Sequence, residues 1–110
     1  MTSSARAQDE NLVRSWGFST VFTWRDEPEP ELISHNLTHP YVYRRDTYYP
    51  PHSHNGLTTH LIRHGTLTIA FPKDGGAKKM YGPGSRIDVD AGQLHEVWIG
   101  YEGCEYVIGE

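Results

Sequence analysis

Short runs of β-branched and aromatic residues, separated by turns rich in glycine and proline, follow one another from residue 18 to the C-terminus. Such runs favour strands over helices, and glycine and proline mark the turns between them. The segment RDEPEPE (25–31) carries two prolines and reads as a surface loop, and PKDGGAKK (72–79) reads as a turn. The pattern predicts an all-β sandwich or barrel. The expected strands cover residues 18–24, 41–49, 58–64, 66–71, 85–89, 95–99 and 105–108.

The first part of the chain differs from the rest. Residues 1–17 are expected to form a flexible N-terminal segment, with a short helix over residues 9–16 that ends at Gly17. Residues 18–110 are expected to form a single domain, because 110 residues suit one hydrophobic core. The helix and the first strand would then be a short extension of that domain.

Charge and composition exclude several classes of partner. The chain has 10 Lys+Arg against 14 Asp+Glu, a net charge of −4, which argues against nucleic acid. No apolar run has the roughly 18–20 residues that cross a bilayer, and no secretory signal is apparent. Cys104 is the one cysteine, which suits a reducing compartment. We therefore expect a cytoplasmic protein with a small-molecule substrate, no nucleic acid and no membrane.

Three of the seven histidines form a pattern typical of a metal site. His52 and His54 are two residues apart, so on a strand their imidazoles face the same side. His95 starts a later strand, after a glycine-containing turn, and is the candidate third ligand. Three imidazoles leave positions open on a metal for water or substrate. A lone His-x-His on a surface strand is nevertheless common and has no function by itself.

The stretch between these histidines resembles the two motifs of the cupin superfamily. The first motif, His-x-His, three or four residues, Glu, six residues, Gly, is matched by HSHNGLTTHLIRHG (52–65). The second, Gly, five residues, Pro-x-Gly, two residues, His, is matched by GSRIDVDAGQLH (84–95). Two positions depart from the pattern: Thr58 replaces the glutamate, and Asp90 replaces the proline.

The resemblance implies a specific fold and assembly. Cupins are small double-stranded β-helix barrels (RmlC-like jelly rolls) that hold a divalent metal inside. Residues 18–110 would form one such barrel, with His52, His54 and His95 as metal ligands. Many cupins are dimers, and the apolar segment 18–24 could add a strand to a neighbouring copy. We therefore expect a homodimer.

Replacement of the glutamate by Thr58 indicates which chemistry to expect. A site of three neutral imidazoles leaves the ion its full double positive charge, which favours substrates that bind as anionic chelates. Such sites resemble those of thiol dioxygenases and diketone-cleaving dioxygenases. Fe(II) is therefore the favoured ion, and Zn, Ni or Mn are alternatives.

His60 lies two residues beyond Thr58, so on a regular strand it faces the same side. Three interpretations remain open: a fourth metal ligand, an acid–base or supporting group of the site, or plain packing. Among the weaker candidates, Tyr48 shares the parity of His52, Tyr106 is expected to pack in the core or at a dimer face, and Cys104 is expected to be structural.

The sequence thus predicts a small metal-dependent enzyme that acts on an oxygen- or sulfur-bearing molecule, with dioxygenation as the first choice. A metal-dependent lyase or isomerase is the alternative, since the same ligands would serve it. A non-catalytic cupin that binds a small ligand is the other possibility.

Overall fold

The computed structural model describes residues 4–27 and 47–110. One helix and six strands occur there. They are α1 (Ala5–Ser15), β1 (Val21–Asp26), β2 (Tyr48–His52), β3 (Thr58–Ala70), β4 (Lys79–Tyr81), β5 (Arg86–Val89) and β6 (His95–Gly109). The expected strand 41–49 falls mostly outside the described residues, as do His35 and His39.

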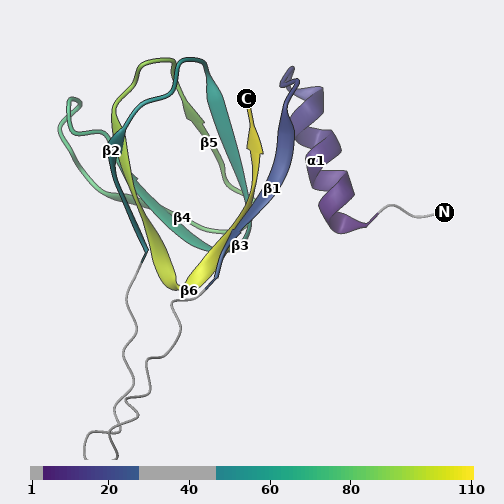
Figure 1. Cartoon of the computed structure of the whole chain (residues 1–110). Coiled ribbons are helices and arrows are strands. Elements are labelled where there is room, and N and C mark those ends of the chain that lie inside the picture. Colours follow the sequence, from purple (N-terminus) through teal and green to yellow (C-terminus); the bar gives the residue numbers. More distant parts are fainter. Residues whose placement is uncertain (1–3, 28–46) are drawn as a thin grey trace, which may run out of the picture.

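The two long strands, β3 and β6, organise the sheet. They pair antiparallel from Thr59 opposite Gly109 to Ala70 opposite Glu96. β6 also pairs with β1 and β2, and β3 also pairs with β4 and β5. The sheet curls around an interior so that β2 and β5 face one another across it (Figure 1). The all-β prediction is therefore confirmed.

Gly65 allows β3 to run on where the sequence suggested two strands. Its φ is +78°, and a Cβ there would lie 2.0 Å from the carbonyl oxygen of Gly103. The pairing of β3 with β6 shifts register on both sides of this glycine. A residue without a Cβ thus lets the strands cross closely, and the ladder continues instead of ending at a turn.

Pro50 and Pro51 directly follow the expected strand 41–49, but they lie inside β2. Within the described residues β2 pairs only with β6, and its register shifts between Tyr49 and His52. Proline lacks an N–H and is tolerated at sheet edges and bulges. The prolines therefore interrupt the ladder without ending the strand.

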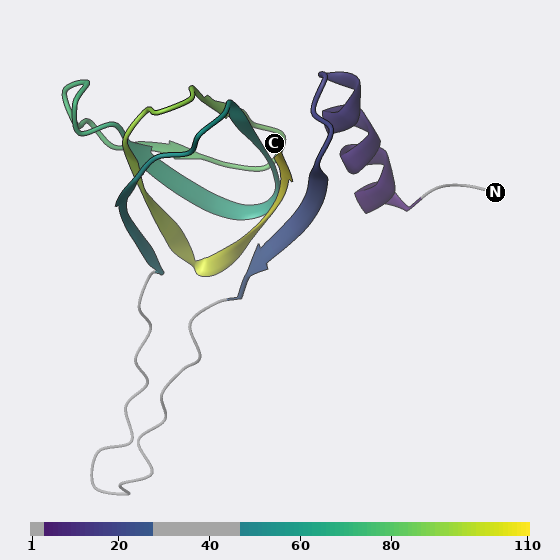
Figure 2. The ribbon, with the colours of Figure 1, turned by 45° about the horizontal axis from the view of Figure 1, so that its top comes forward.

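The N-terminal helix begins earlier than expected. Ser4 caps it by accepting a hydrogen bond from the N–H of Ala7 at 3.1 Å, so residues 5–8, expected to be flexible, are helical. α1 lies outside the barrel beside β1 (Figure 2). Its Val13 packs on Phe18, Leu61 and Val107. Within residues 4–27 and 47–110, no helix is long and apolar enough to span a membrane.

Arg63 ties the helix to the barrel. Its guanidinium binds Asp9 of α1 at 2.8 Å and Glu105 of β6, and its side chain is only 11% exposed. A cation–π contact between Arg86 and the ring of Trp16, at 4.0 Å, adds a second attachment. Polar as well as apolar contacts therefore hold the extension on the sheet.

Candidate metal centre and its cavity

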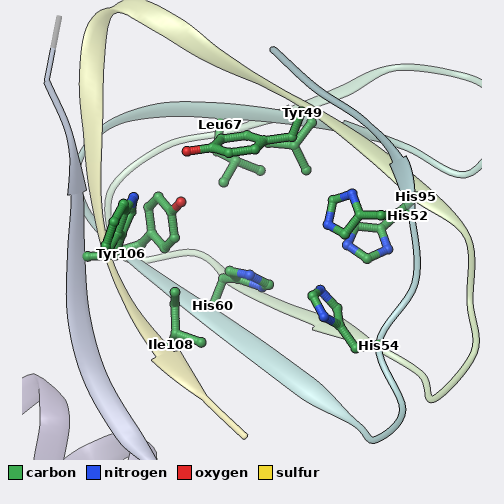
Figure 3. A pocket seen from close by; sticks show the side chains of 10 residues that line it. Tyr49, His52, His54, His60, Leu67, His95, Tyr106 and Ile108 are labelled. Carbon is green, nitrogen blue, oxygen red and sulfur yellow. The ribbon is translucent and has the colours of Figure 1, made fainter. Parts of the chain in front are cut away.

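Three histidines from two distant parts of the chain meet inside the barrel. His52 ends β2, His54 follows it, and His95 begins β6 directly opposite His52 in the antiparallel ladder. One ring nitrogen from each lies within 4.8 Å of those of the other two. The ring centroids are 4.2 to 5.2 Å apart. Figure 3 shows the three rings grouped at one end of the cavity.

Backbone carbonyls orient two of these rings. The Nδ1 of His52 lies 2.8 Å from the carbonyl oxygen of Pro50, and the Nδ1 of His95 lies 3.0 Å from that of Gln93. A carbonyl oxygen only accepts hydrogen bonds, so Nδ1 must carry the proton in both rings. Each neutral ring is left with a lone pair on Nε2. Such a bond on the other nitrogen typically fixes the tautomer of a metal-binding histidine.

Burial keeps His95 unprotonated. This residue is 1% exposed. Desolvation lowers its pKa below the usual value, and the neighbouring His52 and His54 lower it further, against a hydrogen bond to Gln93. A neutral imidazole is the form that binds metal, so His95 is ready for ligation near neutral pH.

His60 lines the same cavity but is outside the group of mutually close donors found among the described residues. Its ring points into the cavity between the three histidines and Tyr106 (Figure 3). Burial is the main cause that lowers its pKa to about 4, and the other histidines add to this. His60 is therefore an uncharged imidazole that faces the cavity.

The cavity has a volume of about 230 Å³, enough for a small organic molecule. Its described lining has no lysine, arginine or carboxylate. The lining residues are Trp24, Tyr49, His52, His54, His60, Leu67, His95, Val97, Tyr106 and Ile108. Apart from the imidazoles and two phenols the walls are apolar, which suits an uncharged or weakly acidic ligand.

Thr58, at the position of the expected glutamate, is 4% exposed. Its Oγ1 has no hydrogen-bond partner among the residues that the structure describes. It lines a second hollow together with His54. Position 58 thus offers a buried hydroxyl in place of a carboxylate, in a hollow that His54 and Glu110 also line.

The end of the cavity away from the three histidines holds a group that the sequence did not reveal. Tyr49 and Tyr106 both donate hydrogen bonds to the carboxylate of Asp26, at 2.5 and 2.8 Å. Asp26 was assigned to the charged loop segment, but it is the last residue of β1. Tyr106 was expected to pack rather than line a pocket, and it does both.

Tyr48 is outside the cavity, contrary to the parity argument. It is 46% exposed, donates a hydrogen bond to Glu96 at 2.7 Å, and lies 5.4 Å from the ring of Trp98. The register shift at the prolines moves Tyr49, not Tyr48, to the side of His52. An alternation count across two prolines could not have found this.

Cys104 and His64 lie apart from the site. Cys104 is buried, and desolvation, with Asp26 and Glu105, raises its pKa to about 12, so it stays an unreactive thiol. The side chain of His64 is 75% exposed at the outer surface.

No family model matches the chain, and no curated protein sequence matches it. Several solved structures are similar to it. The polyketide cyclase RemF from Streptomyces resistomycificus is 25% identical over 57% of this chain and 44% of its own length, with a TM-score of 0.51. A cupin-2 domain protein from Shewanella frigidimarina is 21% identical over 79% of this chain and 83% of its own, with a TM-score of 0.52.

A variant of oxalate decarboxylase from Bacillus subtilis gives a TM-score of 0.57 at 14% identity, over 80% of this chain. The match covers only 19% of the decarboxylase. The chain therefore spans less than half of RemF and about a fifth of the decarboxylase. At such identities the similarity concerns the fold.

Proposed function

We propose that this chain, which has the cupin fold, is a small metal-dependent enzyme in which His52, His54 and His95 hold a divalent ion. The convergence of three imidazoles within 4.8 Å, from two distant parts of the chain, is the observation that carries the proposal. The substrate would be small, since the cavity measures about 230 Å³, and it would bind the ion through an oxygen or sulfur atom.

The donor set fits a divalent transition metal. Two of the rings carry their proton on Nδ1 and keep Nε2 free. The buried His95 stays neutral because desolvation lowers its pKa. Imidazole nitrogens suit Fe, Zn, Ni and Cu, whereas Mg and Ca prefer oxygen. We favour Fe(II), with Zn, Ni or Mn as alternatives.

We infer dioxygenation as the reaction. Fe(II) bound by three neutral imidazoles would supply a cation that attracts an anionic substrate and reacts with O₂. The chain itself supplies apolar walls, Leu67, Val97 and Ile108, that exclude water from the bound molecule. His60, neutral and turned into the cavity, could form a hydrogen bond with the substrate and so orient it.

The second candidate is a lyase, isomerase or cyclase, in which the ion only polarises the substrate. The uncharged His60 beside the three histidines favours it, because proton transfer is the protein's part in such reactions. The similarity to a polyketide cyclase at 25% identity supports the same alternative.

Metal content tests the site. The purified protein is reconstituted with Fe(II) without oxygen, and bound metal is measured by elemental analysis. We expect about one ion per chain, retained by His64→Ala and lost by His52→Ala, His54→Ala or His95→Ala. His64 is the matched control because it is a histidine of β3 at the exposed surface. Full occupancy in any of the three variants would remove that residue from the ligand set.

Oxygen consumption with a panel of thiols and β-dicarbonyls tests the reaction. Uptake that depends on Fe(II) supports dioxygenation. Tight zinc or nickel without uptake supports the second candidate, and no metal at all would leave a cupin that binds a small ligand without catalysis.

We also propose a homodimer in the cytoplasm. Among the described strands, β1 pairs only with β6, so its other edge could pair with a second copy. A monomeric mass by light scattering would contradict the dimer.

A further inference from the structure

Asp26 gathers three hydrogen-bond donors at one end of the cavity. Its Oδ1 accepts from the hydroxyl of Tyr49 at 2.5 Å and from the indole N–H of Trp24 at 3.2 Å. Its Oδ2 accepts from the hydroxyl of Tyr106 at 2.8 Å. Both tyrosines line the cavity, and their hydroxyls lie together away from the three histidines (Figure 3). The cavity therefore has an imidazole end and a phenol end.

The carboxylate determines how the phenols can bind a ligand. A phenol has one hydrogen to donate and lone pairs with which to accept, and a carboxylate only accepts. Since Tyr49 and Tyr106 both donate to Asp26, their hydrogens are committed to it. Toward the cavity each oxygen can then offer only lone pairs.

Both tyrosines remain protonated. Burial, with the hydrogen bond to Asp26 and its charge, raises the pKa of Tyr49 to about 12. The same causes, led by burial, raise the pKa of Tyr106. A negative carboxylate thus lies behind two neutral acceptors, and the described lining of the cavity contains no cationic side chain.

We propose that Tyr49 and Tyr106, held by Asp26, bind a hydroxyl or N–H donor at the end of the substrate that is remote from its metal-binding group. The substrate is then a small, mainly apolar molecule with an anionic chelating end and a donor end. This inference rests on the proposed function and adds how the protein binds the end of the substrate that does not contact the metal. Asp26 acts through the tyrosines, so it is a positioning residue.

Phenol and its methyl ether, anisole, test the proposal without any metal. The two probes have similar shapes, but only phenol has a hydrogen to donate. Dissociation constants are measured in EDTA from the shifts of amide signals of the cavity strands. We expect the wild type to bind phenol about fivefold more tightly than anisole, because a hydrogen bond of ordinary strength gives that ratio.

Two variants test which groups are responsible. Tyr106→Phe removes one of the two acceptors. Asp26→Asn leaves only one acceptor oxygen, so the hydroxyl of one tyrosine loses its acceptor and can turn its hydrogen to the cavity. Each variant should therefore lower the ratio. Tyr48→Phe is the matched control, since this neighbouring tyrosine faces outward, and it should keep the wild-type ratio. Because the readout is a ratio of two ligands, a general loss of stability would not imitate the result.

Equal binding of phenol and anisole by the wild type would overturn the proposal. So would an unchanged phenol preference in both Tyr106→Phe and Asp26→Asn. If the protein prefers phenol, the variants lower that preference and no metal binds, the proposed enzyme fails while the donor-binding end stands. If it binds metal but shows no phenol preference, the reverse holds.

Discussion

Two neighbouring threonines of β3 have opposite surroundings and should respond oppositely to the same substitution. Thr58 is buried, and its hydroxyl has no hydrogen-bond partner among the described residues. Thr59 is fully buried on the helix side, and its hydroxyl donates to the carboxylate of Asp88 at 2.6 Å. Replacement of either by valine exchanges a hydroxyl for a methyl group of nearly the same size.

The expected changes have opposite signs. A buried hydroxyl without a partner costs about 1–3 kcal/mol, so Thr58→Val should raise the free energy of unfolding by about 1 kcal/mol. A hydrogen bond to a charged group contributes about 1.5–3 kcal/mol. Because the side chain of Asp88 is 44% exposed, we expect the lower end, a loss of about 1.5 kcal/mol for Thr59→Val. The two variants should thus differ by about 2.5 kcal/mol.

Guanidinium unfolding followed by tryptophan fluorescence, in EDTA, measures both values. Thermal midpoints should separate by roughly 10–20 °C, since 1 kcal/mol shifts the midpoint of a small domain by about 4–8 °C. If Thr58→Val destabilises the protein as much as Thr59→Val, the Thr58 hydroxyl has a partner and the reasoning is wrong. Repeating the titration with metal then shows whether that hydroxyl supports the site.

Two further predictions concern charge. Since the pKa of His60 is about 4 when folded and about 6.5 when unfolded, the unfolded chain binds protons first as the pH falls. The free energy of unfolding in EDTA should therefore decrease between about pH 6.5 and pH 4, by up to about 3 kcal/mol. In His60→Gln the free energy of unfolding should depend less steeply on pH. The same pH dependence in both proteins would contradict the burial of a neutral His60 ring. Arg63→Met should cost about 3 kcal/mol in urea titrations because it leaves two carboxylates unpaired in a partly buried place. Arg25→Met removes an exposed ion pair and should cost less than about 1 kcal/mol, and equal losses would refute the contrast.

Periodicity and motif spacing were sufficient for the fold and for bringing His52, His54 and His95 together. The alternation of side chains along a strand was reliable on β3, where His60 lines the cavity as expected. Parity failed at the prolines of β2, where a register shift turns Tyr49 inward instead of Tyr48.

Asp26 could not have been found from the sequence. It begins a run of charged residues and prolines that is typical of a loop, and only the pairing of β1 with β6 brings it opposite Cys104. Its partners Tyr49 and Tyr106 are distant from it along the chain. Local patterns describe the residues within one strand, whereas this cluster depends on which strands become neighbours.

The way in which β2 is attached to the sheet affects how firmly His52 is held. This strand is joined to the described sheet through β6 alone, and its two prolines cannot donate to the ladder. His52 therefore belongs to a strand that is held on one side only, while His95 begins β6, which pairs with β1, β2 and β3. A cation bound to both His52 and His95 would stabilise β2 against local opening. Amide hydrogens around residues 48–54 should then exchange with solvent more slowly with metal than without it.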